Sequence, residues 1–138
     1  MALHLQIGRA ESVIFLCRID DLARTGAKSV VLGEGADTLD VLVVEKNGAR
    51  HAYINSCPHQ FLPLETFPDH VFTQDKVHLV CSGHGALFEP GTGECVEGPC
   101  EGEHLERLQI IEQDGAIYLN EALSPARIAE AKKSKRNW

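Results

Sequence analysis

The amino-acid sequence predicts an all-β fold, arranged as an antiparallel sheet sandwich or an open barrel, with a short helix at its C-terminal end. Short runs rich in Val, Leu and Ile recur along the chain, with turn-forming residues between them. Two β-prone pairs of runs are separated by Asn-Gly or Asp-Gly, which are strong hairpin signals. Apart from a turn or short helix expected near residue 20, helix-forming patterns are found only in the last residues. These observations favour packed antiparallel sheets.

The apolar runs give the expected strands in order. They lie at residues 12–17, 30–32, 39–44, 50–55, 77–80, 108–112 and 116–119. Residues 20–27 predict a turn or a short helix between the first two strands. Asn47-Gly48 and Asp114-Gly115 predict hairpins, because both central residues of such a turn need positive φ.

The C-terminal residues predict a helical tail at 124–138. Ser124 can cap a helix, Pro125 suits its first position, and residues 126–132 are good helix formers. Residues 132–136 are basic, which favours a solvated helix end over the alternative of a docking tail. We expect residues 1–138 to form a single domain.

Size and charge limit the possible functions. The chain has 138 residues, 43% of them hydrophobic, and a net charge of −7. This charge argues against nucleic acid or an anionic membrane as a partner. No apolar run approaches the roughly 20 residues that cross a bilayer. The first residues lack the pattern of a signal peptide, so we expect a cytoplasmic protein.

Two short segments carry the candidate chemistry. The first contains Cys57, Pro58 and His59, and the second runs from Cys81 to His84. Each segment offers one thiolate and one imidazole, so two loops of this kind could hold one compact metal centre between them. Zinc is an alternative, since two Cys and two His form a common structural zinc set. Zinc fingers, however, usually group the two Cys together and the two His together.

Residues 57–100 resemble the cluster-binding region of the Rieske family. After the second Cys and His, residues 85–88 read Gly-Ala-Leu-Phe, and a Gly-rich turn and a Gly-Pro pair follow. The resemblance implies a Rieske fold with a small cluster-binding subdomain at about residues 55–101 and one [2Fe–2S] cluster. One iron would bind Cys57 and Cys81, and the other would bind His59 and His84.

The resemblance also gives roles to glycine and proline residues near the four ligands. Gly83 and Gly85 would let the backbone approach the cluster, and Gly98 with Pro99 would form a stiff lid over it. Pro58 would restrict the first loop before the metal binds.

High-potential members of the family carry an extra disulfide and two hydroxyl groups that donate hydrogen bonds to the cluster. The cysteine positions correspond to Leu62 and Gly83 here, and the hydroxyl positions to Ala86 and Phe88. Fewer donors leave the reduced cluster less stabilised. We therefore expect a low potential, near the −150 mV end of the Rieske range of about −150 to +300 mV.

These features are similar to soluble Rieske ferredoxins. The resemblance implies a one-electron carrier, not itself an enzyme, that connects a flavin reductase to a terminal oxygenase. The alternatives are the small subunit of a nitrite reductase-like enzyme, which would bind its large subunit, and a redox sensor. Five glutamates near the second loop could form an acidic docking rim: Glu89, Glu94, Glu97, Glu101 and Glu103.

Three cysteines are not expected to be ligands. We expect Cys17, Cys95 and Cys100 to be buried thiols, with a disulfide between the last two as the alternative in an oxidising compartment. The long separation between the ligand pairs suggests an insertion at residues 64–76. This loop could help form a docking face or could simply be packed against the fold.

Overall fold

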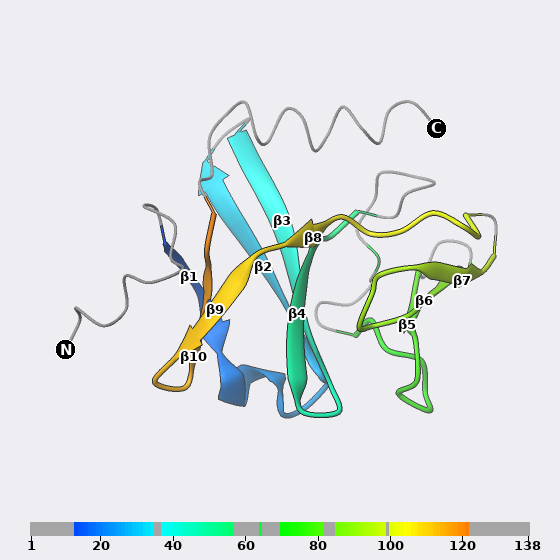
Figure 1. Cartoon of the computed structure of the whole chain (residues 1–138), viewed down its shortest axis with the longest axis horizontal. Coiled ribbons are helices and arrows are strands. Elements are labelled where there is room, and N and C mark those ends of the chain that lie inside the picture. Colours follow the sequence, from blue (N-terminus) through cyan, green and yellow to red (C-terminus); the bar gives the residue numbers. More distant parts are fainter. Residues whose placement is uncertain are drawn as a thin grey trace.

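The computed structural model describes residues 13–34, 37–56, 64, 70–81, 85–98 and 100–121 (Figure 1). The described part contains one 3-10 helix and ten short strands. In chain order these are β1 Ile14–Arg18, η2 Ile19–Leu22, β2 Ala27–Glu34, β3 Asp37–Lys46, β4 Ala49–Ile54, β5 Leu79–Val80, β6 Leu87–Phe88, β7 Cys95–Glu97, β8 Arg107–Leu108, β9 Ile110–Gln113 and β10 Ala116–Leu119.

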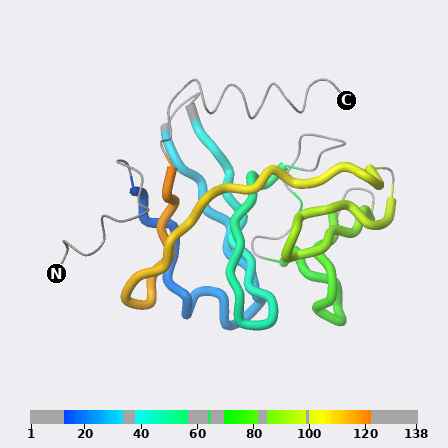
Figure 2. The backbone as a smooth tube through the Cα atoms, viewed as in Figure 1, coloured from blue at the N-terminus to red at the C-terminus, as the bar shows by residue number. Residues whose placement is uncertain are grey.

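The strands form three sheets in which every pairing is antiparallel. The strand orders are β1-β10-β9, β2-β3-β4-β8 and β5-β6-β7. Figure 1 shows the four-stranded sheet in the middle, with the first sheet on one side and the small third sheet on the other. The path in Figure 2 leaves β4, forms the third sheet in green, and returns in yellow through β8. The predicted antiparallel all-β fold is confirmed.

The central strand β3 is buried on both of its faces. Val41 and Val43 pack with β1 and β10 in one core, while Leu42 and Val44 pack with the third sheet in another. All four side chains are fully buried. Successive residues of a strand point to opposite faces, so an uninterrupted apolar run is what a strand between two cores requires.

Both predicted hairpins are confirmed. Asn47 and Gly48 have φ values of 55° and 81° and connect β3 to β4. Asp114 and Gly115 have φ values of 52° and 78° and connect β9 to β10. Positive φ at both positions is the conformation that Asn-Gly and Asp-Gly favour.

Other predicted boundaries differ from the structure. The single strand expected at 108–112 is wrong: β8 pairs with β4, whereas β9 pairs with β10, and the chain changes sheet at Gln109. The turn or helix expected at 20–27 is the 3-10 helix η2, which begins at Ile19. The predicted helical tail at 124–138 lies outside the described residues. No helix in the described part is long and apolar enough to span a bilayer.

Candidate metal centre

Cys81 is the predicted ligand that the structure describes. It follows β5 directly, and its side chain is 1% exposed. Cys57, His59 and His84 lie outside the described residues, as do Pro58, Gly83 and Pro99. The structure therefore gives the surroundings of one ligand and the anchors of the two loops.

The turn that begins at Cys81 joins β5 to β6. The Cys81 backbone N–H donates to the Ala86 carbonyl at 2.9 Å, and the Gly85 N–H donates to the Cys81 carbonyl at 2.7 Å. Gly85 has φ of 71°, and a Cβ atom there would meet no protein atom within 4 Å. Its positive φ, which L side chains adopt only with strain, accounts for glycine at this position. The turn thus holds the Cys81 backbone in a closed loop.

Gly98 packs against this turn from the following strand. It lies just after β7 with φ of 113°, and a Cβ atom there would be 2.8 Å from Ala86 Cα. Only a residue without a side chain can approach the Ala86 backbone this closely. The predicted lid residue Gly98 therefore touches the Cys81 turn through Ala86.

Asn55 anchors the first loop and was not recognised in the sequence. It follows β4, is 3% exposed, and its Oδ1 accepts a hydrogen bond from the Leu64 N–H at 3.0 Å. Its Nδ2 donates to Ser29 Oγ at 3.3 Å, and its own N–H donates to the Asp40 carbonyl at 2.9 Å. Asn55 therefore ties together the two ends of the segment that contains Cys57 and His59.

Tyr53 fixes the third sheet to the central sheet. Its hydroxyl donates to the Pro90 carbonyl at 2.7 Å, and Arg107 Nη2 donates to that hydroxyl at 3.3 Å. Arg107 also donates to the Gly91 carbonyl and lies over the Tyr53 ring, 5.3 Å from its centroid. Burial raises the pKa of Tyr53 to about 12, although the nearby Arg107 charge acts in the opposite direction. The turn after β6 is thereby held against β4 and β8.

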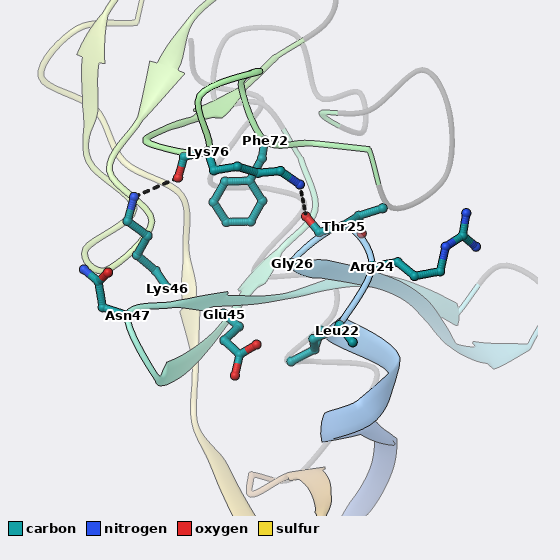
Figure 3. A pocket seen from close by; sticks show the side chains of 10 residues that line it. Leu22, Arg24, Thr25, Gly26, Glu45, Lys46, Asn47, Phe72 and Lys76 are labelled. Atoms are coloured by element: carbon teal, nitrogen blue, oxygen red, sulfur yellow. Dashed lines mark hydrogen bonds between the residues drawn. The ribbon is translucent and has the colours of Figure 1, made fainter.

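The segment at 64–76 is packed against the fold at some of its described positions, while His70 and residues 74–76 are exposed. Leu64 and Val71 are fully buried, and the Phe72 ring lies against Gly26. Lys46 Nζ donates to the Lys76 carbonyl at 2.8 Å (Figure 3). These contacts account for the packed positions, and a docking role for the exposed ones stays a prediction.

A pocket of about 350 Å³ lies at this junction. Residues from the turn after η2, the β3–β4 hairpin and the 72–76 segment surround it (Figure 3). Cys81 does not line it. The pocket is therefore separate from the described part of the candidate centre.

The remaining cysteines are buried, as expected. Cys17 in β1 is 2% exposed, Cys95 is 1% exposed and Cys100 is 3% exposed. The sulfur atoms of Cys95 and Cys100 are 3.0 Å apart, which brings together the two cysteines for which the sequence left a disulfide as the alternative.

The described residues fit an iron–sulfur centre of the expected kind. The Cys81 sulfur is shielded from water, and thiolates are the ligands that iron–sulfur clusters use. Ala86 and Phe88 are fully buried and bring no hydroxyl group to the Cys81 turn. The chemistry and burial around Cys81 are thus those expected for a buried, thiolate-bound iron.

Comparison with known proteins identifies the family of the chain. A family model described as the Rieske [2Fe-2S] domain matches residues 12–118. Human apoptosis-inducing factor 3 is 31% identical over 104 residues, which are 75% of this chain and 16% of the human protein. This chain therefore spans only a small part of the length of that relative.

Solved structures share the fold. The ferredoxin of Sphingomonas yanoikuyae B1 has a TM-score of 0.63 and 19% identity, over 80% of this chain and 100% of that one. A chain in the complex of reduced oxygenase and oxidised ferredoxin in carbazole 1,9a-dioxygenase has a TM-score of 0.61 and 21% identity, over 78% of this chain and 92% of that one. Together with the family match, these similarities confirm the predicted Rieske fold.

Proposed function

Since the chain belongs to the Rieske [2Fe–2S] domain family and therefore carries one Rieske-type [2Fe–2S] cluster, we propose that it is a one-electron carrier. We assign the cluster to Cys57, His59, Cys81 and His84. The observation that carries this assignment is the Cys81 thiol, buried at the end of β5 in a turn closed by its own backbone hydrogen bonds. The cluster supplies reversible one-electron oxidation and reduction.

The protein positions the two loops, shields Cys81 from water and places few side-chain hydroxyl donors beside Cys81. Asn55 holds the ends of the first loop together, and Gly98 covers the second loop at Ala86. The side chains of Ala86 and Phe88 offer no hydroxyl donor. We therefore propose a midpoint potential near the low end of the Rieske range, at about −150 mV.

We further propose that the partners are a flavin reductase and the terminal oxygenase of a multicomponent dioxygenase. Two observations support this: the likeness to a ferredoxin and to a chain of an oxygenase–ferredoxin complex, and the acidic residues near the lid. Glu94, Glu97 and Glu101 are exposed there and would suit a basic partner surface. We propose that the carrier works in the cytoplasm.

The ligand assignment is tested by electron paramagnetic resonance of the anaerobically purified protein after reduction with dithionite. We expect an average g value clearly below that of all-cysteine [2Fe–2S] proteins. His59→Cys and His84→Cys should each abolish this signal, while Cys17→Ser, which changes a buried cysteine in β1, should leave it intact. A colourless protein with stoichiometric zinc, or an unchanged signal in both histidine variants, would contradict the assignment.

Redox titration of the same sample tests the proposed low midpoint potential. We expect a single one-electron wave near −150 mV. A potential near +300 mV would place the protein with the high-potential members of the family and contradict the low-potential proposal.

A second candidate is a fixed electron-transfer component of a larger oxidoreductase, such as the small subunit of a nitrite reductase-like enzyme. The human relative supports this candidate, because the region that matches this chain makes up only 16% of a much longer protein. Purification from the native source at low salt distinguishes the two. A large subunit that remains in constant ratio through size exclusion would favour the fixed component, and an isolated chain would favour the mobile carrier.

A further inference from the structure

Two cysteines outside the predicted ligand set meet in the third sheet. Cys95 begins β7, and Cys100 follows the turn after it. The Cys100 thiol lies with its sulfur 3.0 Å from Cys95 Sγ, and the two residues are only 3% and 1% exposed. A disulfide bond is about 2 Å long, so the sulfurs need to approach by only about 1 Å to bond.

Backbone hydrogen bonds hold the two cysteines in this position. The Cys95 N–H donates to the Glu103 carbonyl at 2.7 Å, and the Glu103 N–H donates to the Cys100 carbonyl at 2.9 Å. The Gly102 N–H donates to the Cys95 carbonyl at 3.2 Å, which joins both ends of the turn. The contact between the thiols is therefore built into the turn.

We propose that Cys95 and Cys100 form a second redox site, a dithiol–disulfide pair that small hydroperoxides oxidise. With hydrogen peroxide, the sulfur of one cysteine attacks a peroxide oxygen and the O–O bond breaks. The departing hydroxide takes the proton of that thiol, so a sulfenic acid and one water form. The sulfur of the other cysteine then attacks the sulfenic sulfur, so that the S–S bond forms, the S–O bond breaks and a second water leaves. In total, two thiols and one hydrogen peroxide give one disulfide and two water molecules.

The burial of both thiols favours an oxidant as small as hydrogen peroxide over a bulky disulfide. The oxidation takes two electrons from the cysteines, whereas the proposed carrier function moves one electron at a time. The pair is thus a separate site, with its own chemistry, in the same small sheet.

The turn between the two cysteines touches the turn that holds Cys81. Gly98 lies between Cys95 and Cys100 in the chain and packs on Ala86, whose carbonyl accepts the Cys81 N–H. A disulfide would restrict the turn that carries Gly98 and so keep it against Ala86. We therefore expect the oxidised pair to slow the loss of the cluster.

Thiol mapping of the whole holoprotein tests the pair directly. The protein is treated with a small molar excess of hydrogen peroxide, quenched in acid, alkylated with N-ethylmaleimide in denaturant, digested and analysed by mass spectrometry. We expect a disulfide bond between Cys95 and Cys100 that dithiothreitol reduces. Cys17→Ser should form the same link. Full alkylation of both cysteines after peroxide, or a link from either to another cysteine, would overturn the proposal.

The effect on the cluster is measured by its visible absorbance in urea with a chelator. The peroxide-treated, repurified wild type should lose its absorbance several-fold more slowly than the dithiothreitol-treated protein. Cys100→Ser should show no difference between the two treatments. The same slowing in Cys100→Ser would overturn the proposed effect of the disulfide on cluster loss. If this variant does not fold, the thiol mapping of the wild type still tests whether Cys95 and Cys100 form a disulfide.

Discussion

At the scale of single residues, the hydrogen bonds of the buried Asn55 side chain give a prediction about stability. Asn55→Ala removes the acceptor of the buried Leu64 N–H and the donor to Ser29 Oγ. An unsatisfied buried amide costs about 1–3 kcal/mol, so we expect the free energy of unfolding to fall by that amount in urea titrations. Ser29→Ala leaves the Leu64 hydrogen bond in place and should cost less. Equal losses in the two variants would contradict an anchoring role for Asn55.

The Tyr53 hydroxyl gives a prediction about pH. The pKa of Tyr53 is raised from 10.0 to about 12 by burial, so the unfolded chain loses this proton at lower pH than the folded protein. The contribution of the Tyr53 hydroxyl to the free energy of unfolding is therefore fully present below pH 10 and is lost as the pH rises to about 12. Tyr53→Phe should remove this part of the pH dependence of unfolding, and it should cost about 1 kcal/mol at neutral pH.

The control for Tyr53 is the second tyrosine of the chain. Tyr118→Phe, in β10, should keep the decline in stability between pH 10 and 12 that the wild type shows. If Tyr53→Phe retained this decline too, another group would be its source.

At the scale of elements, two glycines with positive φ should respond differently to alanine. Gly48, in the β3–β4 hairpin, has φ of 81° and open space around it, so Gly48→Ala should cost about 1 kcal/mol of unfolding free energy. Gly98→Ala adds a contact of 2.8 Å with the Ala86 backbone and should cost roughly 2–4 kcal/mol. It should also speed the loss of cluster absorbance, which Gly48→Ala should not. Equal effects of the two substitutions on stability and on cluster loss would show that Gly98 does not pack against the Cys81 turn.

The elements also show what the sequence could predict. The hairpins at Asn47-Gly48 and Asp114-Gly115 were predictable because the turn chemistry is local. The break at Gln109 was not, because it depends on which distant strand each half pairs with. The very short strands β6 and β7 likewise depend on their partners rather than on a long apolar pattern.

The candidate site divides in the same way. The ligand motif and the glycines beside it lie in two short segments, so they could be proposed from the sequence, and the assignment of the four ligands stays a prediction. Asn55 and Tyr53 act on segments distant in the chain, since the Tyr53 hydroxyl reaches a carbonyl 37 residues away. The contact between Cys95 and Cys100 needed the fold of the turn, because the sequence favoured two separate buried thiols and left a disulfide only as the alternative.

At the scale of the whole molecule, net charge should control the rate at which the protein associates with a charged redox partner. The chain has a net charge of −7, and Glu97 and Glu101 are exposed close to Gly98 in the chain. We expect the reduced protein to transfer electrons to a basic acceptor, such as cytochrome c, more slowly as ionic strength rises. The screening length falls from about 30 Å at 0.01 M to about 3 Å at 1 M salt, so long-range attraction is lost over this range.

Stopped-flow kinetics with charge-reversal variants separates a local docking surface from the effect of net charge. Glu97→Lys and Asp20→Lys change the total charge equally, but Asp20 lies in η2, which Figure 1 shows far from β7. If the partner docks at the exposed glutamates close to Gly98, Glu97→Lys should lower the rate at low salt clearly more than Asp20→Lys, and the difference should vanish at high salt. Equal decreases would mean that the overall field steers the encounter, and the acidic residues beside Gly98 would then have no special part in docking.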